Sequence, residues 1–141
     1  MQAWPEPVEQ IAAFLRSAGT EGRIEELPAG VDEPPGIALR AAGFECAGRM
    51  LVALVPAHRA IDRDKLAGAA GCSTLRPAPF PAFPFQSARV FMERSVLSTG
   101  IVWLKAGSPR HVLGLNPGQL IRLTRSETAD LVQEGHFEGG S

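Results

Sequence analysis

The segment "AGSPRHV", residues 106–112, gathers side chains that could do chemistry at one turn. Ser108, Arg110 and His111 follow Gly107, and apolar strand-like stretches lie on both sides of the turn. Exposed backbone N–H groups together with a guanidinium and a hydroxyl could form a cradle for an anion or a developing oxyanion. A plain hairpin turn with its polar side chains in water is the alternative, and the residues alone leave both open.

The sequence has none of the standard signatures of chemistry. It contains no G-x-G-x-x-G, no G-x-x-x-x-G-K, no H-E-x-x-H and no G-x-S-x-G. Serines near 98–100 and 106–108 have no general base next to them in sequence, which argues against a serine nucleophile. His58 is expected in a solvated loop and His136 in a tail, so no metal site and no cofactor are predicted.

A stiff apolar segment, "PAPFPAFPF" at residues 77–85, holds four prolines and three phenylalanines without a charge. Proline fixes its own φ, lacks an N–H and pushes the preceding residue toward extended conformations, which excludes helix and central strand. The phenylalanines favour a lid that folds back over its own domain. A proline ligand for another protein's groove is the alternative.

Composition and charge restrict the class of protein. The chain has 141 residues, 45% hydrophobic and 21% charged, with a net charge of −1. These values predict one globular domain over residues 1–135 with a flexible tail at 136–141. With a net charge near zero, the chain lacks the excess positive charge that would bind the phosphates of a long nucleic acid. The composition still allows a nucleic-acid partner that is contacted only at its end.

The two cysteines, Cys46 and Cys72, are predicted to be reduced core thiols, because their number and spacing fit neither a disulfide framework nor a metal site. Reduced thiols suit a cytoplasmic protein. No signal sequence and no membrane-spanning run is visible in the sequence. The oligomeric state is left open.

Local patterns predict an α+β fold, a single compact domain with a mixed, mostly antiparallel sheet flanked by helices. A buried strand is expected at 48–56, and Asp62 and Asn116 are expected as helix N-caps. The expected helices are 5–19, a short one around 37–43, 62–71, 117–124 and 126–135. The expected strands are 22–27, 48–56, 73–76, 88–94, 100–107 and 110–116, the last two as a hairpin.

Two stretches resemble the YbaK-like prolyl-tRNA-editing domains. They are "CAGRMLVALVPAHRAIDRDKLAGAAG" at 46–71 and "VFMERSVLSTGIVWLKAGSPRHVLGLNPGQLIRLTRSETADLV" at 90–132. The resemblance covers roughly residues 35–132 and rests on the order of elements and local pattern. It implies a compact mixed α/β fold and hydrolysis of the ester that joins a wrong amino acid to tRNA.

Several members of this family have neither a protein nucleophile nor a metal, and use backbone amides, an ordered water and the terminal hydroxyl of the tRNA. The resemblance therefore implies a free-standing trans-editing deacylase that touches mainly the acceptor end. Its expected substrate is a small or apolar amino acid on a tRNA of the prolyl type. The residues implied as catalytic are Gly107, Ser108 and His111, and those implied as substrate-binding are Arg49, Phe80, Phe83, Pro84, Phe85 and Arg110.

The sequence departs from the family pattern at two places. Arg49 stands where the resemblance places a lysine, and the two are not interchangeable in a tight pocket. Residues 77–85 replace a short helix and a glycine-rich specificity loop, and only Pro84 can be aligned with that loop. The phenylalanines could therefore narrow the pocket of an enzyme, or close it in a non-catalytic binding module that keeps the fold.

Overall fold

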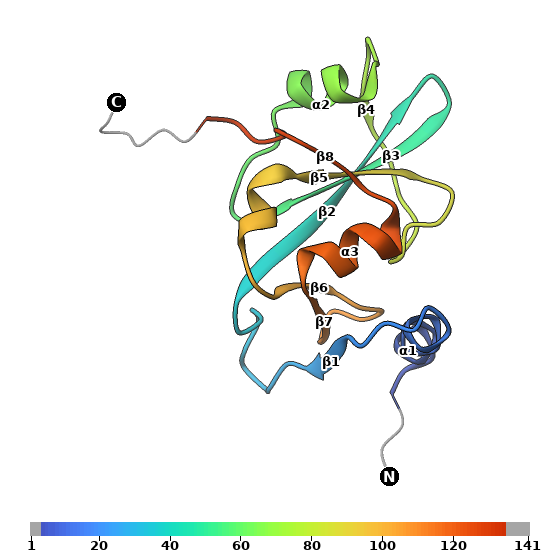
Figure 1. Cartoon of the computed structure of the whole chain (residues 1–141), viewed down its shortest axis with the longest axis vertical. Coiled ribbons are helices and arrows are strands. Elements are labelled where there is room, and N and C mark those ends of the chain that lie inside the picture. The colour runs from blue at the N-terminus through green and yellow to red at the C-terminus, as the bar shows by residue number, and fades with distance from the viewer. Residues whose placement is uncertain (1–3, 135–141) are drawn as a thin grey trace, which may run out of the picture.

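A computed structural model of the chain describes residues 4–134. The tail predicted at 136–141, with His136, lies outside the described residues. Figure 1 shows three helices arranged around a strongly twisted sheet. The helices are α1 (Glu6–Ser17), α2 (Arg63–Ala70) and α3 (Pro117–Thr124), with a 3-10 turn η1 (Arg94–Ser98). The strands are β1 (Arg23–Glu26), β2 (Ile37–Cys46), β3 (Arg49–Pro56), β4 (Arg76–Pro77), β5 (Arg89–Glu93), β6 (Val102–Lys105), β7 (His111–Leu115) and β8 (Glu127–Ala129).

One eight-stranded sheet runs through the domain in the order β1-β7-β6-β2-β3-β5-β8, with β4 paired to β2. β2 joins the two ends of the sheet, because it pairs with β6 at its start and with β3 and β4 farther along. Four strand pairs are antiparallel and three are parallel. The predicted α+β fold with a mixed sheet is confirmed.

β3 is covered on both faces, as its continuous apolar run predicts. Side chains alternate across a strand, so Val52 and Leu54 join one apolar core while Leu51 and Val55 join the other. α1, α3 and residues 83–85 contribute to the first core, and α2 packs on the second through Leu66. The sheet therefore separates two apolar cores.

Helix ends follow the predicted capping pattern. The Asp62 carboxylate accepts hydrogen bonds from the backbone N–H groups of Asp64 and Lys65, which caps α2. Asn116 and Gln119 form a reciprocal capping box at the start of α3, where Pro117 occupies the first turn. None of the described helices is long and apolar enough to cross a membrane.

The short helix predicted at 37–43 is wrong. These residues open β2, which pairs with β3 from Leu39↔Pro56 to Cys46↔Arg49. A two-residue hairpin turn closes the pair, with Ala47 at φ 53° and Gly48 at φ 81°. Alanine and leucine favour helix locally, but the backbone pairing along the hairpin outweighs that weak preference.

The helix predicted at 126–135 is also wrong. α3 ends at Thr124 and is capped by Arg125, whose φ is 56°, and the chain then enters β8, parallel to β5. The backbone N–H of Leu131 then donates to Glu93, and Val132 forms a bridge with Ile61. These partners are distant in sequence, so the helical spacing of 126–135 gave no hint of them. The strand predicted at 73–76 overlaps β4 only at Arg76.

The two cysteines form a disulfide, so the prediction of reduced thiols is wrong. Cys46 ends β2 and Cys72 follows α2, and their Cα atoms lie 6.3 Å apart, within the ordinary range for a disulfide. The bond joins the β2–β3 hairpin to the end of α2. Because disulfides are rare in the cytosol of mesophiles, the cytoplasmic expectation loses the support that reduced thiols gave it.

Candidate functional site

A cleft of about 340 Å³ lies between α1 and residues 81–86, and we name it the α1 cleft. Gly107, from the turn between β6 and β7, completes the wall. The lining is apolar apart from two glutamine side chains. It consists of Pro7, Gln10, Ile11, Phe14, Pro81, Ala82, Phe83, Pro84, Gln86 and Gly107.

The proline–phenylalanine loop, residues 77–85, is held to the sheet where it begins. Pro77 pairs with Phe44 of β2, and the N–H of Ala78 donates to the carbonyl of Gly43 at 3.0 Å. A Cβ on Gly43 would lie 2.4 Å from the Ala78 carbonyl oxygen and 2.7 Å from the ring of Phe80. Gly43 therefore allows the loop to cross β2 at close range.

The loop folds back over its own domain, as the lid interpretation predicts. Phe83 and Phe85 are only 6% and 4% exposed and belong to the core around α1. Phe83 meets Phe14 of α1 and Phe85 edge-on, with ring centroids 6.1 Å and 5.8 Å apart. Phe83 and Pro84 line the cleft, Phe85 lies in the core, and Phe80 is 39% exposed on the outside.

Gly107 lies where the turn meets the N-terminal end of α1. Its φ is +89°, and a Cβ there would come within 2.8 Å of the Val8 nitrogen and 2.9 Å of the Pro7 carbonyl carbon. Only glycine fits such a close approach of two backbones at this φ. The turn therefore presents bare main chain to the cleft.

Ser108 and His111 form a hydrogen-bonded pair directly after Gly107. The Ser108 hydroxyl lies 2.7 Å from His111 Nδ1 and accepts a hydrogen bond from the backbone N–H of Arg110 at 3.0 Å. His111 opens β7, is 5% exposed and meets the ring of Trp4 edge-on at 6.2 Å. Neither side chain lines the α1 cleft, and the hydrogen bonds of the pair lie within the turn at residues 108–111.

Arg110 points away from the cleft. Its guanidinium donates to the carbonyls of Leu27 and Pro28 and forms an ion pair with Asp32 at 3.3 Å. These contacts secure the loop after β1. The side chain thus lies in the predicted turn but not at the cleft.

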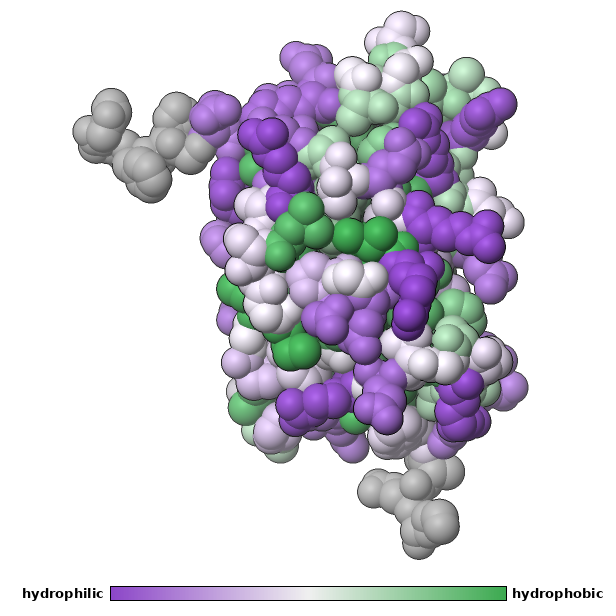
Figure 2. Space-filling model, viewed as in Figure 1, coloured by the Kyte–Doolittle hydropathy of each residue, from purple (hydrophilic) through white to green (hydrophobic). Residues whose placement is uncertain are grey.

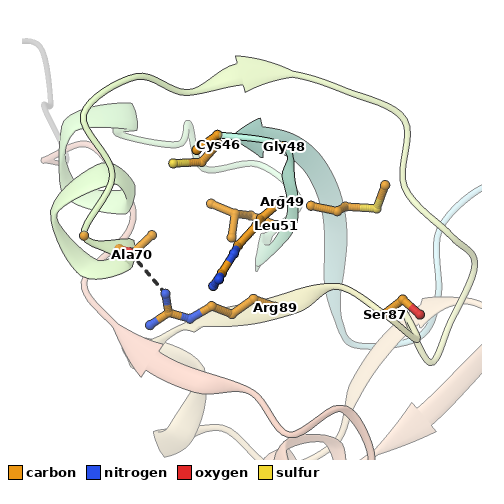
Figure 3. Close-up of a pocket in the computed structure, with 10 residues that line it drawn as sticks. Cys46, Gly48, Arg49, Leu51, Ala70, Ser87 and Arg89 are labelled. Atoms are coloured by element: carbon orange, nitrogen blue, oxygen red, sulfur yellow. Dashed lines mark hydrogen bonds between the residues drawn. The ribbon is translucent and has the colours of Figure 1, made fainter.

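Arg49 lines a different and larger cavity of about 600 Å³, which we name the Arg49 cavity. It lies between the β2–β3 turn, the end of α2 and the start of β5 (Figure 3). Arg49 opens β3 at the β2–β3 hairpin and lines only this cavity of the two, whereas Gly107 lies in the turn between β6 and β7 and lines only the α1 cleft. The structure therefore does not bring Arg49 and Gly107 to one cavity, contrary to the expectation of a shared site.

Two carboxyl groups with lowered pKa values, Glu93 and Asp130, do not line the α1 cleft. Burial alone would raise the pKa of Glu93, but backbone N–H groups of Leu131 and Ser95 donate to it at 2.8 Å and 3.0 Å and bring it below its usual value. A hydrogen bond from Lys65 lowers the pKa of Asp130. Both groups join β8 to its neighbours, which indicates a structural role.

Comparisons with known proteins place the fold. No family model and no curated protein matches the sequence. A solved structure of a candidate trans-editing enzyme for prolyl tRNA synthetase matches at a TM-score of 0.81 and 19% identity, covering 94% of this chain and 100% of that one. A scaffold protein used in computational epitope grafting matches at a TM-score of 0.80 and 18% identity, covering 94% of this chain and 100% of that one. The fold is that of the YbaK-like editing domains.

The same fold also occurs within a longer protein. A candidate signal transduction protein from Marinobacter aquaeolei matches at a TM-score of 0.70 and 17% identity, with 94% of this chain covering 31% of that chain. At such identities the likeness describes the backbone arrangement and not the chemistry of a site. The function must be argued from the residues themselves.

Sequence reasoning missed the residues that α1 contributes to the cleft. Pro7, Gln10, Ile11 and Phe14 recur at helical spacing, so they share one face, but periodicity does not tell what that face packs against. Gln86 was not among the predicted site residues, because the predicted loop ends at Phe85. Among residues 4–134, no group of three or more His, Cys, Asp or Glu side chains is arranged to hold a metal.

Proposed function

We propose that the protein is an aminoacyl-tRNA deacylase. Its α1 cleft would hold the amino acid of a mischarged tRNA of the prolyl type, with the acceptor end as the contact. The observation that carries this proposal is the small apolar cleft whose wall contains Gly107, in a fold shared with a candidate trans-editing enzyme. A cleft lined by prolines and phenylalanines with two amide side chains suits a small aliphatic side chain and a polar ester.

The volume of the cleft supports a small substrate. At about 340 Å³ it is near the lower end of the range for ligand sites. Apolar contacts separate substrates differing by one methylene by only about 1 to 3 kcal/mol, so selectivity would come mainly from excluding large side chains. Phe14 and Phe83 pack edge-on and stiffen the wall that does so.

The chemistry needs no covalent enzyme intermediate. Water would attack the ester carbonyl, the carbon–oxygen bond to the ribose would break, and the ribose oxygen would take up a proton. Positioning and donors aimed at the oxyanion can supply much of the rate enhancement. Gln10 and Gln86, on opposite walls, each offer an amide donor and acceptor, and the bare main chain at Gly107 allows close approach.

The Ser108–His111 pair would act as a positioning element for the turn at Gly107. Replacing Ser108 by alanine removes the 2.7 Å contact to Nδ1 and the acceptor for the Arg110 N–H. We expect hydrolysis to fall in that variant with an unchanged pH profile, because the hydroxyl orients the turn and does not attack. A pH profile that changes shape in Ser108→Ala would instead assign the pair to proton transfer.

The direct test is deacylation across a panel of tRNAs charged with amino acids of increasing size. Alanyl or similarly small esters should be hydrolysed fastest, and Gln86→Leu should lower the rate without unfolding the protein because Gln86 is exposed. A protein that hydrolyses none of the panel would contradict the proposal.

A non-catalytic binding module with the same fold is the second candidate. The burial of Phe83 and Phe85 in the core favours it, since the loop fills space behind the cleft. The lining of the cleft also contains no carboxylate, imidazole or thiol. Binding of tRNA or of a protein partner without hydrolysis would distinguish this module from a deacylase.

A further inference from the structure

Strand β1 lies at an open end of the sheet. It pairs with β7 on one side, and in the part of the chain that the structure describes no strand pairs with its other side. Figure 1 shows β1 at the lower end of the sheet, beyond β7. A hollow of about 780 Å³, lined in part by Arg23 and Ile24 of β1 and by Arg16 of α1, opens beside the strand. The outer edge of β1 is therefore accessible to another strand.

The backbone of Ile24 points to this open edge. Leu27 donates its backbone N–H to the carbonyl of Arg110 at 2.7 Å, which continues the ladder between β1 and β7. Backbone groups alternate in direction along an antiparallel pair, so Arg23, Glu25 and Leu27 face β7. The N–H and C=O of Ile24 therefore face away from β7, and an edge with such groups is a template for pairing with another chain.

The charges of β1 are complementary to β1 itself. When two copies of one strand pair antiparallel around a two-fold axis, side chains directly opposite each other share a face of the sheet. A pair centred on Ile24 sets Arg23 of each copy opposite Glu25 of the other, and the two Ile24 residues exchange their outward N–H and C=O groups. A pair centred on Arg23 or Glu25 would set like charges opposite each other, which destabilises a sheet. The charges therefore select the register in which the free backbone groups meet.

The two charged side chains already lie together in one copy. Arg23 and Glu25 form an ion pair at 2.5 Å, and their side chains are 69% and 38% exposed. Pairing would extend this contact into a cluster of alternating charges across the axis, and networks stabilise more than isolated surface pairs. Figure 2 shows hydrophilic and apolar residues intermixed at this end of the face in view. The contact would thus depend on backbone hydrogen bonds and charges, and it should weaken as the salt concentration rises.

The strand at the other end of the sheet lacks this complementarity. A pair of β8 strands centred on Thr128 would set Glu127 opposite Ala129, and Glu127 is already paired with Arg89 at 2.7 Å. We infer that the protein forms a two-fold dimer in which β1 pairs antiparallel with β1 of a second copy, so that one sheet runs through both. Because no residue of β1 lines the α1 cleft, this inference does not depend on the proposed function.

Sedimentation equilibrium of the full chain at increasing protein concentration tests the inference, because it gives the dissociation constant of the dimer. The parent should approach the mass of two chains and stop there, since a two-fold contact closes. Arg23→Glu and Glu25→Arg each set like charges opposite each other at two places and should raise the dissociation constant about tenfold or more. A parent that stays monomeric, or that assembles beyond a dimer, would overturn the inference.

A mixture of the two single variants gives the sharpest readout. β1 carries only negative charges in Arg23→Glu and only positive charges in Glu25→Arg at these two positions, so the variants should pair with each other more tightly than with themselves. The double variant should recover the dissociation constant of the parent. A mixture that associates no better than the single variants would show that these charges do not meet across the contact, and the inference would fall.

Arg76→Glu and Glu45→Arg are the matched controls. This ion pair, 2.9 Å apart with side chains 72% and 37% exposed, joins β4 to β2 away from β1. Neither reversal should change the dissociation constant, and a change as large as that at β1 would mean general charge attraction and overturn the inference. Thermal melting of every variant shows that the fold is kept, and an unfolded chain could not rescue association in the mixture.

Discussion

Gly107→Ala tests whether α1 is held against the turn that lines the cleft. The new Cβ would lie 2.8 Å to 3.1 Å from backbone atoms of Pro7 and Val8, which cannot rotate away as a side chain could. The left-handed φ of +89° adds a conformational cost of about 1 to 2 kcal/mol for alanine. Overpacking typically costs a further 1 to 3 kcal/mol, so the expected loss of unfolding free energy is about 2 to 5 kcal/mol.

Gly30→Ala provides the matched control. Gly30 has a similar φ of +81°, but a Cβ there has nothing within 4 Å. Gly30→Ala should therefore lower the free energy of unfolding only by the conformational cost of the left-handed φ, about 1 to 2 kcal/mol. The difference between the two variants measures the contact between the turn and α1.

The assay is urea unfolding followed by tryptophan fluorescence, to which the buried Trp103 contributes, with deacylation measured on the same samples. Gly107→Ala should unfold at lower urea than Gly30→Ala and lose hydrolysis, because α1 must move away from the cleft. Equal unfolding free energies in the two variants would show that α1 does not lie against Gly107. That result would refute the geometry of the cleft.

Three other perturbations have outcomes fixed by the structure. Cys46→Ser removes the disulfide, whose two cysteines are 26 residues apart in sequence, and should lower the free energy of unfolding by about 3 kcal/mol. The melting temperature of this variant should be lower than that of the parent and should not change when a reductant is added. Glu93→Gln should lower the free energy of unfolding at neutral pH, because a carboxyl group with a lowered pKa stabilises the fold while it is ionised. This effect should disappear as the pH falls below 4.5, the ordinary pKa of a glutamate carboxyl. A difference in stability that stays constant in acid would contradict this expectation. Phe83→Ala should lower the free energy of unfolding by about 3 to 5 kcal/mol, because it leaves a cavity in the core. The variant should also hydrolyse esters of larger amino acids, and an unchanged substrate range would show that Phe83 does not limit the size of the substrate.

Elements with strong local signals were predicted from the sequence. The apolar run of β3, the Asp62 cap of α2, the Asn116 cap of α3 and the β6–β7 hairpin all follow from short stretches of residues. Residues 37–43 lie in β2 and residues 127–129 form β8, because their pairing partners lie elsewhere in the chain. Local propensity is a weak guide where distant pairing decides.

The candidate site was only partly predictable for the same reason. Gly107, Phe83 and Pro84 stand out in the sequence by residue type and do line the α1 cleft. Gln10 lines the cleft only because α1 packs there, and nothing local to α1 indicates its partner. Arg49 was placed by a family pattern, and the structure shows it at a cavity of its own.

We propose that the α1 cleft hydrolyses small aminoacyl esters on tRNA. The most direct measurement is the rate of release of alanine from alanyl-tRNA of the prolyl type, compared with that of a bulky amino acid on the same tRNA. We predict rapid release of alanine and slow release of the bulky amino acid by the parent protein. In Phe83→Ala, the rate of release of the bulky amino acid should increase. No release of either by a folded protein that still binds the tRNA would contradict the deacylase and leave the binding module.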